Sequence, residues 1–367
     1  MGNTTRMLQE ENILENRMPP RDDRVAIAMS GGVDSAASAV LMVEAGYACM
    51  GLTLRMLRTP GCDTKTAEDA RRICDALNIP HKTVEVAEAF DYHIVNRFVR
   101  EYAAGRTPNP CIRCNRMIKF GLLVKEARRL GHDYVATGHY ARLAVRDGRL
   151  ALHRAVHLPK DQSYVLAPLT QAQLRHACFP LGGLSKVEAR NIAGKIDVSI
   201  GASKESQEIC FVPGNDYAAM VESRGGAGAP GLIKDLQGKV LGTHAGIHHY
   251  TIGQRHGLGI SAERPLYVVR LEPAENTVYV GFVETSLCDV FRTGPLFWGA
   301  ILPQVAAFRA EVQIRYKHRA APCLVTPLPD GAQVRLDTPQ RSVTPGQWAA
   351  FYDAEGVVLA AAEIRNQ

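Results

Sequence analysis

Residues 25–140 alternate between short apolar runs and longer segments in which apolar positions recur at helical spacing. The apolar runs lie at 25–28, 49–54, 83–86 and 134–137. The segments between them place apolar side chains three or four residues apart, at 35–45, 66–77, 90–102 and 116–130. Strands that alternate with helices in this way form a parallel sheet covered on both faces. We therefore expect an α/β, doubly wound domain.

The carboxyl ends of these strands are where a ligand is expected. Doubly wound sheets bind ligands in the crevice outside the carboxyl ends of their strands. Three segments lie at or directly after strand ends, namely Ser30–Ser35, Leu54 and Gly138-His139. We expect these segments to share one pocket.

The second half of the chain has a different pattern. Ser185 and Glu188 form a capping box that predicts the start of a further helix. Residues 225–259 are rich in Gly and His and predict a small linker domain with loops. From about residue 266 short β-type runs follow closely, which predicts a terminal β-barrel. These runs lie at 266–271, 277–283, 311–316, 323–326, 333–337, 348–352 and 357–361.

Ala28–Ser35 is the stretch around which the first domain is organised. It reads Ala-Met-Ser-Gly-Gly-Val-Asp-Ser and joins a strand end to a helix start. Such a junction presents unpaired backbone N–H groups and the positive end of the helix dipole, and its glycines let an anion approach closely. Asp34 adds a carboxylate suited to Mg²⁺ carried by a polyphosphate. The sequence is not a Walker A loop, because G-x-x-x-x-G-K-[ST] is absent from it.

Thr107–Asn115 is the second stretch with chemical potential. It reads Thr-Pro-Asn-Pro-Cys-Ile-Arg-Cys-Asn, and its two prolines predict a rigid loop rather than a helix. Cys114 would lie just before a helix, a place that lowers the pKa of a thiol and favours the nucleophilic thiolate. A third cysteine, Cys210, follows in Ser206–Phe211. Metal binding or redox chemistry explains the Cys111/Cys114 pair better than simple burial does, although a second close pair of zinc ligands is not evident.

Composition narrows the class of protein. The 367 residues are 46% hydrophobic and 22% charged, which predicts a soluble globular protein of two or three domains. No segment approaches the ~20 apolar residues that span a bilayer. A net charge of +6 permits an RNA partner without requiring one. Nine cysteines and an N-terminal stretch unlike a signal peptide predict reduced thiols in the cytosol, that is, a cytoplasmic protein.

The motifs together resemble those of one family. S-G-G-x-D-S at 30–35 is similar to the PP-loop of the ATP pyrophosphatases, which adenylate their substrates. T-P-N-P-x-x-x-C-N, A-T-G-H-Y, K-D-Q-S-Y, I-C-F, G-Q-R-x-G-L-G, R-Y and T-P-G-Q follow in this order. From about residue 24 to the C-terminus the chain therefore resembles the bacterial tRNA-specific 2-thiouridylases. That family uses ATP to replace the C2 oxygen of the tRNA wobble uridine by sulfur.

The resemblance implies a domain organisation and partners. It implies a flexible tail over 1–23, a PP-loop catalytic domain over 24–212, a small central domain over 213–280 and a β-barrel over 281–367. ATP with Mg²⁺ is the implied cofactor. The implied partners are tRNA and a sulfur-donor protein of a persulfide relay, with no membrane.

The resemblance also implies roles for particular residues. Cys114 resembles the nucleophilic cysteine and Cys210 the cysteine that carries sulfur as a persulfide, the two being able to close a disulfide bond. The implied ATP contacts are Ala28, Met29, Ser30, Gly31, Gly32, Val33, Asp34, Ser35, Leu54 and Gly138. The target base would dock at Asn109, Pro110 and Cys111. The implied tRNA contacts are His139, Lys160, Asp161, Gln162, Arg315, Tyr316 and Gln347.

One position departs from the family pattern and leaves alternatives open. Many family members carry Asp where this chain has Cys111, and a thiol is a weaker proton-transfer group. Cys111, Cys114 and Cys210 could instead supply three thiolates to an iron–sulfur cluster, which would perform the same reaction by another route. Two further hypotheses are a PP-loop ligase that acts on a small molecule, which would need neither Cys114 nor Cys210, and a non-catalytic RNA-binding module, in which Asp34 would be dispensable.

Overall fold

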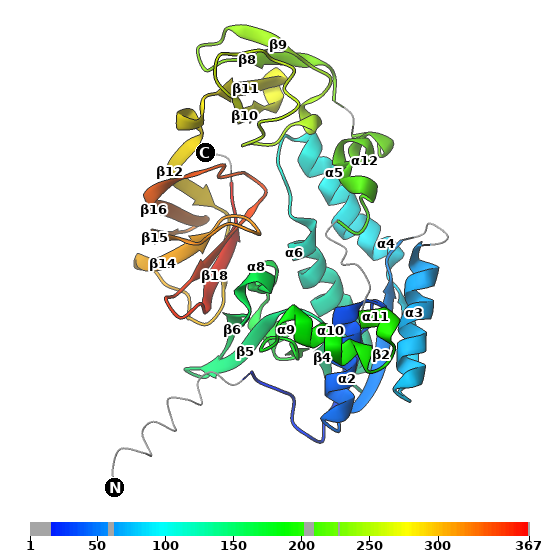
Figure 1. The fold of residues 1–367 in the computed structure, drawn as a ribbon. Coiled ribbons are helices and arrows are strands. Elements are labelled where there is room, and N and C mark those ends of the chain that lie inside the picture. The colour runs from blue at the N-terminus through cyan, green and yellow to red at the C-terminus, as the bar shows by residue number, and fades with distance from the viewer. Residues whose placement is uncertain (1–15, 58–61, 202–208, 227, 366–367) are drawn as a thin grey trace.

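The computed structural model describes residues 16–57, 62–201, 209–226 and 228–365. Within these ranges the chain forms an α/β domain, a small sheet domain and a C-terminal barrel (Figure 1). Of the predicted N-terminal tail, the described part lies against the α/β domain. The Asn16 side chain donates to the Phe179 carbonyl over 2.7 Å, and the Tyr47 hydroxyl donates to the Pro19 carbonyl over 2.7 Å. Helices long and apolar enough to span a membrane do not occur in the described ranges.

A five-stranded parallel sheet forms the centre of the α/β domain. Its strands, in spatial order, are His81–Glu85 (β3), Ala48–Arg55 (β2), Arg24–Ala28 (β1), Tyr134–Ala136 (β4) and Ala177–Cys178 (β7). All neighbouring pairs run parallel. The four strands expected from the apolar runs are therefore confirmed to within two residues. The fifth strand, β7, has only two residues and was not among the predicted strands.

Helices cover both faces of this sheet, which confirms the doubly wound class. Alternate residues of β1 point to opposite cores: Val25 and Ile27 lie in one hydrophobic cluster, and Ala26 lies in the other. The first cluster is closed by Val33–Glu44 (α2), Cys62–Ala76 (α3) and Lys186–Gly194 (α10). The second is closed by the consecutive helices Pro110–Cys114 (α6), Asn115–Leu123 (η3, of π type) and Val124–Arg129 (α7).

The remaining helices are short or continue one another. The segment Ala87–Ala103 is helical throughout, as Ala87–Phe90 (α4), Asp91–Val95 (η2, of π type) and Asn96–Ala103 (α5). The capping box at Ser185 is confirmed, because the Ser185 hydroxyl accepts from Glu188 N and the Glu188 carboxylate accepts from Ser185 N. The other α-helices are Ser163–Leu166 (α8), Gln171–Leu174 (α9), Val198–Gly201 (α11) and Tyr217–Ser223 (α12).

Two helix starts differ from the sequence-based expectation. The helix expected from residue 66 begins earlier, at Cys62. The helix expected from residue 116 begins at Pro110, so Thr107–Asn115 is only partly a loop and Cys114 lies within a helix. The physical reason is that proline suits the first helical position, where its missing N–H would have no partner. Asn109 then caps this helix, because its side-chain oxygen accepts from Ile112 N over 3.3 Å.

The order of the strands creates a switch point beside β1. From β1 the chain crosses to β2 on one side, and β4 lies on the other side. The loops that leave the carboxyl ends of β1 and β4 therefore diverge and leave a crevice between them. This topology places the turn Met29–Gly32 next to the segment Thr137–His139, as expected for a shared pocket.

The central domain holds a four-stranded sheet, and one prediction about its strands is wrong. Its strands, in spatial order, are Tyr267–Glu272 (β10), Thr277–Gly281 (β11), Gly231–Lys234 (β8) and Val240–His244 (β9). The β-type runs at 266–271 and 277–283 therefore belong here and not to the terminal barrel. They resembled barrel strands because strand periodicity reports exposure of one face and not the identity of the pairing partner.

The C-terminal barrel is a seven-stranded antiparallel sheet that closes on itself. Its strands, in spatial order, are Leu287–Thr293 (β12), Gly331–Arg341 (β16), Ala321–Leu328 (β15), Phe308–Gln313 (β14), Trp348–Tyr352 (β17), Val358–Glu363 (β18) and Phe297–Trp298 (β13). A bridge between Thr293 and Ile364 joins β12 to the end of β18. The barrel also shares a hydrophobic cluster with the α/β domain through Trp348, Tyr352 and Val358, beside the hairpin Ala141–Arg146 (β5) and Arg149–Arg154 (β6).

Candidate active site

The turn between β1 and α2 has the geometry of an anion site. Gly32 is the N-cap of α2 and has no side chain that could occupy the first N–H groups of the helix. Gly31 has φ +71°, and a Cβ at this position would lie 2.8 Å from the Cβ of Asp69, so only glycine fits. The Ser35 hydroxyl lies inside the turn, where it donates to the Gly32 carbonyl over 2.9 Å and accepts from the Ser30 hydroxyl over 3.2 Å.

The segment after β4 forms the opposite wall of the crevice. A Cβ on Gly138 would lie 2.8 Å from the carbonyl carbon and the Cβ of Asp34, so the two backbones are in close contact. His139 is buried, and its Nδ1 lies 2.8 Å from the Thr137 hydroxyl. Burial lowers the pKa of His139 well below its usual range, so the imidazole is neutral at pH 7. The structure thus brings Ser30–Ser35 and Gly138 together, as the sequence predicted.

Asp34 has two partners that the sequence analysis missed. The Tyr140 hydroxyl donates to Asp34 Oδ1 over 2.8 Å, and Lys186 Nζ donates to the same oxygen over 2.7 Å. The Asp34 side chain remains 36% exposed, whereas Lys186 is 11% exposed. Lys186 is the first residue of α10, where the helix dipole disfavours a cation. A lysine at the first position of a helix is unfavourable unless an anion lies nearby. Lys186 was therefore the sequence signal for an anionic partner such as Asp34.

The apolar residues expected to contact ATP pack in the hydrophobic clusters around this turn. Met29 and Val33 are buried in the cluster beneath α2, and Ala28 packs on the opposite cluster. Leu54, at the end of β2, packs against two clusters. One lies beneath the sheet, and the other contains Cys114 and Phe211. The end of β2 therefore connects the crevice to the cysteine region.

The predicted base-docking segment is held between the α/β domain and the barrel. Thr107 N donates to the Pro345 carbonyl over 2.9 Å, and the Gln347 amide donates to the Thr107 carbonyl over 2.8 Å. Asn109 then caps α6, Pro110 is buried, and Cys111 is exposed at the second position of the helix. Gln347 therefore contacts the base-docking segment within the protein, whereas a contact of Gln347 with tRNA stays a prediction.

All three cysteine thiols have a raised pKa, whereas a lowered pKa was predicted for Cys114. Cys114 lies inside the helical run and not at its start, so the predicted lowering of its pKa by a helix N-terminus is wrong. Desolvation of the sulfur raises the pKa of Cys114 to about 11 and that of Cys210 to about 12, and it also raises the pKa of Cys111, although the residues Cys111 and Cys210 lie at the surface. Lys119 lowers the pKa of all three thiols, though by less than burial raises it. Lys119 is a third residue that the sequence analysis missed.

The sulfur atoms of Cys111, Cys114 and Cys210 are not arranged to bind a metal ion or a cluster together in this structure. Cys111, Cys114 and Cys210 are free cysteines, and their sulfurs do not all lie within 4.8 Å of one another. The structure therefore gives no support to an iron–sulfur cluster at these residues.

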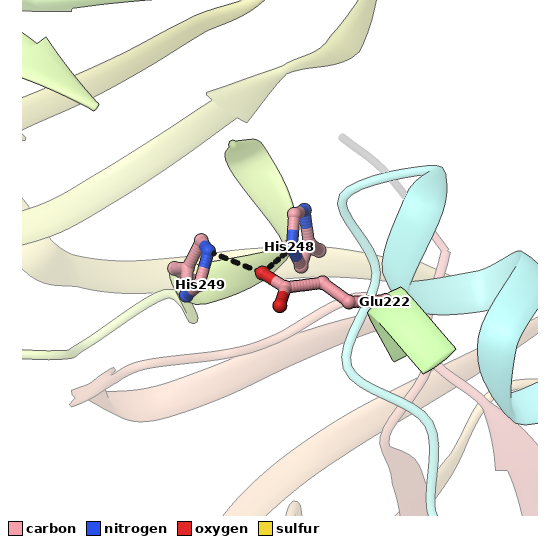
Figure 2. Close-up of side chains that lie close together, drawn as sticks. All are labelled: Glu222, His248 and His249. Atoms are coloured by element: carbon pink, nitrogen blue, oxygen red, sulfur yellow. Dashed lines mark hydrogen bonds and ion pairs between the residues drawn. The ribbon is translucent and has the colours of Figure 1, made fainter. Parts of the chain in front are cut away.

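Three side chains of kinds that can bind metal ions lie close together in the central domain: Glu222, His248 and His249 (Figure 2). Nε2 of His248 lies 3.1 Å and Nε2 of His249 lies 3.0 Å from Glu222 Oε1. Nδ1 of His248 accepts from Gly228 N over 3.3 Å, so the proton of a neutral His248 is on Nε2. The trio is therefore satisfied by hydrogen bonds that connect α12 to the 3₁₀ turn Ile247–His249 (η6).

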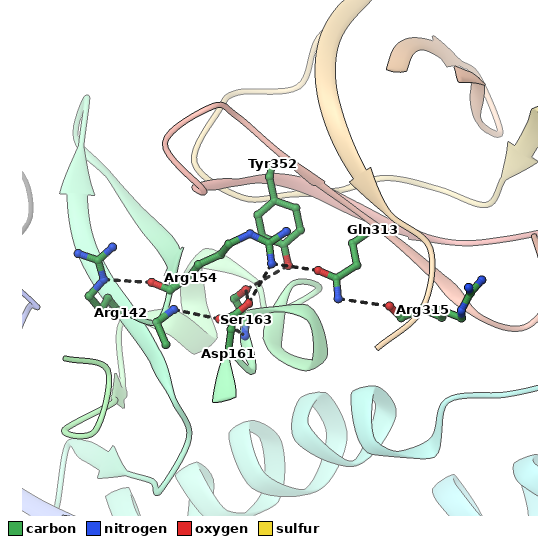
Figure 3. Close-up of polar contacts among 8 residues, drawn as sticks. Arg142, Arg154, Asp161, Ser163, Gln313, Arg315 and Tyr352 are labelled. Atoms are coloured by element: carbon green, nitrogen blue, oxygen red, sulfur yellow. Dashed lines mark hydrogen bonds and ion pairs between the residues drawn. The ribbon is translucent and has the colours of Figure 1, made fainter. Parts of the chain in front are cut away.

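The segment Lys160–Gln162 lies where the α/β domain meets the barrel (Figure 3). The Asp161 carboxylate is 5% exposed, accepts from Ser163 N over 3.1 Å and pairs with Arg154 over 3.0 Å. The Gln162 side chain accepts from Tyr140 N over 3.0 Å. The side chains of Asp161 and Gln162 thus hold the segment in place, and their contacts with tRNA stay predictions, as does that of Lys160.

Arg315 and Tyr316 follow β14 on the barrel. The Arg315 guanidinium donates to the Arg341 carbonyl over 3.1 Å and is exposed, while burial of part of the side chain lowers its pKa. Tyr316 is 38% exposed, and its ring centroid lies 6.4 Å from that of the buried Tyr164. The structure places these residues on the barrel side of the junction that contains Lys160–Gln162.

Three family models together match nearly the whole chain. A tRNA methyl transferase HUP domain matches residues 23–214, a tRNA methyl transferase PRC-barrel domain matches 220–282, and an aminomethyltransferase beta-barrel domain matches 289–364. The solved structures that resemble the chain are remote: NMN synthetase from Francisella tularensis shares 17% identity over 56% of this chain and 78% of its own, with a TM-score of 0.33.

Curated relatives are far more similar. The tRNA-specific 2-thiouridylase MnmA of Geotalea uraniireducens is 45% identical over 91% of this chain and 93% of that protein. The tRNA-specific 2-thiouridylase MnmA 1 of Caldanaerobacter subterraneus is 42% identical over 92% of this chain and 96% of that protein. The tRNA-specific 2-thiouridylase MnmA of Leptospira biflexa is 40% identical over 93% of each chain. With this identity over nearly the full length, the chain belongs to the tRNA-specific 2-thiouridylase family.

Proposed function

We propose that this chain is a tRNA 2-thiouridylase, which uses ATP to replace the C2 oxygen of the tRNA wobble uridine by sulfur. The observation that carries the proposal is the 45% identity to a named 2-thiouridylase over 91% of the chain. The site agrees with that chemistry, because the end of the strand beside the anion-binding turn carries Leu54, which packs against the cluster that contains Cys114.

The turn Ser30–Ser35 binds the phosphates of ATP in this proposal. The N–H groups at the start of α2 face the phosphate oxygens, and the exposed Asp34 carboxylate holds Mg²⁺. Lys186 lies against Asp34 and supplies a positive charge for the departing pyrophosphate. ATP supplies the activation: adenylation converts the C2 oxygen of uridine, a poor leaving group, into one that departs as AMP.

Sulfur arrives at C2 from a persulfide on Cys210. The terminal sulfur attacks C2 as AMP departs, which forms the new C–S bond and breaks the C–O bond. The Cys114 thiolate then attacks Sγ of Cys210. This step breaks the S–S bond, leaves the terminal sulfur on the uridine and forms a Cys114–Cys210 disulfide. Two equivalents of a cellular thiol reduce this disulfide before the next turnover.

The proposed partners follow from the same chemistry. A sulfur-donor protein of a persulfide relay loads Cys210, which is exposed. The tRNA lies across the junction of the α/β domain and the barrel, against Lys160, Arg315 and Tyr316. The reaction takes place in the cytosol, where reductants keep the thiols free.

In vitro thiolation tests this proposal. Protein whose Cys210 has been loaded with sulfur by a small-molecule persulfide is incubated with an unmodified tRNA transcript and MgATP for a single turnover, and the nucleosides are analysed by mass spectrometry. We expect 2-thiouridine that depends on both ATP and protein, and none with Asp34→Asn. If ATP is cleaved without tRNA and 2-thiouridine never forms, the chain is a small-molecule PP-loop ligase instead.

The substitution Cys111→Asp tests the sulfur route. The thiol of Cys111 takes no part in the persulfide chemistry, so this variant should keep thiolation within about threefold of the wild type, since one neighbouring group has changed and the two reacting sulfurs remain. Protein purified without air should contain no bound iron. Loss of activity in Cys111→Asp, together with iron in the wild type that Cys111→Ala lacks, would contradict the persulfide route.

A further inference from the structure

Tyr140 contacts two different parts of the predicted site. Its side chain is buried, and its hydroxyl donates to Asp34 Oδ1 over 2.8 Å. Its backbone is paired with Gln162 in both directions: Tyr140 N donates to Gln162 Oε1 over 3.0 Å, and Gln162 N donates to the Tyr140 carbonyl over 2.8 Å. One residue therefore connects the carboxylate of the ATP turn to the segment Lys160–Gln162.

The segment Lys160–Gln162 is in turn bonded to the barrel (Figure 3). Asp161 accepts from Arg154 over 3.0 Å, and the same Arg154 nitrogen lies 3.0 Å from Gln313 Oε1. The Arg154 guanidinium stacks 3.7 Å from the centroid of the Tyr352 ring. Gln313 donates onward to the Arg315 carbonyl over 3.2 Å.

The middle of this chain of contacts is rigid. Asp161 is 5% exposed and Gln313 6%, and the Tyr352 ring on which Arg154 stacks is fully buried. Side chains packed this closely have one low-energy arrangement, and their hydrogen bonds strengthen one another in a low dielectric. A displacement at Arg315 or Lys160 is therefore transmitted to Tyr140 rather than absorbed locally.

We propose that Tyr140 is a positioning residue that orients Asp34 and couples tRNA docking at the barrel junction to ATP binding at the turn. The inference rests on the proposed function, because it takes tRNA and MgATP as the two ligands. Tyr140 touches neither ligand. It acts by setting the direction of the Asp34 carboxylate according to the position of Gln162.

The test measures the coupling between the two ligands. The Kd of a non-hydrolysable MgATP analogue is determined by calorimetry with and without a saturating tRNA transcript, and the Kd of tRNA is determined with and without the same analogue. We expect the wild type to bind each ligand at least about fivefold more tightly in the presence of the other, by the same factor in both directions. Tyr140→Phe, which keeps the ring and removes the hydroxyl, should reduce that factor to below about twofold.

Two variants complete the experiment. Tyr47→Phe is the matched control: it also removes one hydroxyl hydrogen bond from the α/β domain, to Pro19, and should keep the wild-type coupling. Gln313→Met breaks the chain at the barrel and should lower the coupling while leaving the Kd of MgATP alone unchanged.

The outcomes separate this inference from the proposed function. A wild type that binds neither MgATP nor tRNA overturns both. A wild type with no coupling, or coupling that Tyr140→Phe and Gln313→Met retain in full, overturns the inference and leaves the proposed function intact. Equal loss of coupling in Tyr47→Phe would show a general effect of a lost hydroxyl and would also overturn it.

Discussion

The ATP turn is already arranged for its reaction in this structure, whereas the cysteine region is not. In the turn, Ser30, Ser35 and Gly32 are joined by hydrogen bonds, and Asp34 is held by Tyr140 and Lys186. In the cysteine region the three thiols are free, and each has a raised pKa that favours the neutral, less reactive form. Activation of the substrate therefore has a preorganised site, whereas sulfur transfer does not.

The difference has a chemical reason. A phosphate-binding turn contacts the same phosphate oxygens before and after ATP is cleaved, so its groups can stay fixed. A persulfide relay must accept sulfur, deliver it and close a disulfide, so its sulfurs must approach one another in sequence. Residues 202–208, which precede Cys210, lie outside the described residues. We expect substrate binding to bring the thiols together and Lys119 to favour their thiolates.

The first prediction concerns pH and sharpens the comparison. Only a thiolate attacks, and burial places the pKa of Cys114 at about 11. The thiolate fraction therefore rises with pH below that value. Single-turnover thiolation should increase between pH 7 and 9 by at most about tenfold per pH unit, because each unit raises the thiolate fraction of a thiol with so high a pKa about tenfold and Lys119 reduces that gain in the bound state. Pyrophosphate release, measured in the same samples, should stay nearly constant. Thiolation that does not depend on pH would contradict the account of buried neutral thiols.

The second prediction tests the close contact that forms the turn. Gly138→Ala would place a Cβ 2.8 Å from Asp34 and force the two backbones apart. We expect a loss of about 1–3 kcal/mol in the free energy of unfolding and about tenfold weaker MgATP binding, as overpacking of a tight contact causes. Chemical denaturation and calorimetry measure the two effects.

Gly183→Ala is the control for this substitution. A Cβ on Gly183 meets nothing within 4 Å, so stability and ATP affinity should be unchanged. If both alanine variants behave alike, the contact between Gly138 and Asp34 does not shape the ATP site.

The third prediction concerns tRNA docking and has the smallest expected effect. Arg315→Ala should lower the slope of log K against log salt for tRNA by roughly 0.7–0.9, the contribution of one phosphate contact, and leave the Kd of MgATP unchanged. Arg309→Ala is the matched control on the same barrel, because Arg309 is already paired with Asp337 over 2.7 Å. An unchanged slope in Arg315→Ala would remove Arg315 from the docking surface.

Much of the fold could be predicted from the sequence because its signals are local. Apolar runs bounded by turn residues gave the four longer strands of the parallel sheet, and the Ser185 capping box gave a helix start. What failed depended on tertiary context. The assignment of 266–283 to the barrel was wrong because pairing partners are not encoded in one strand. The hairpin β5–β6 was missed, although Asp147-Gly148, both at positive φ, is a strong turn signal.

In the active site, too, local motifs could be predicted and contacts between distant segments could not. Gly31, Asp34 and Gly138 could be assigned because they belong to contiguous motifs at strand ends. Tyr140 and Lys186 were missed as partners of Asp34, since they come from segments 106 and 152 residues away. The pKa of Cys114 was predicted in the wrong direction because burial, which the sequence does not report, outweighs its position near a helix. Proline at the first helical position further concealed that the helix starts at Pro110.

The double variant Cys114→Ser, Cys210→Ser tests most directly the claim that activation and sulfur transfer are separate. After treatment with the same small-molecule persulfide, the double variant is mixed with tRNA transcript and MgATP, and pyrophosphate and 2-thiouridine are measured in the same reaction. Because the ATP turn contains neither cysteine, we predict a normal initial release of pyrophosphate that requires tRNA, with no 2-thiouridine. The same double variant with Asp34→Asn added should release no pyrophosphate. Formation of 2-thiouridine by the double variant, or loss of its tRNA-dependent pyrophosphate release, would contradict the account.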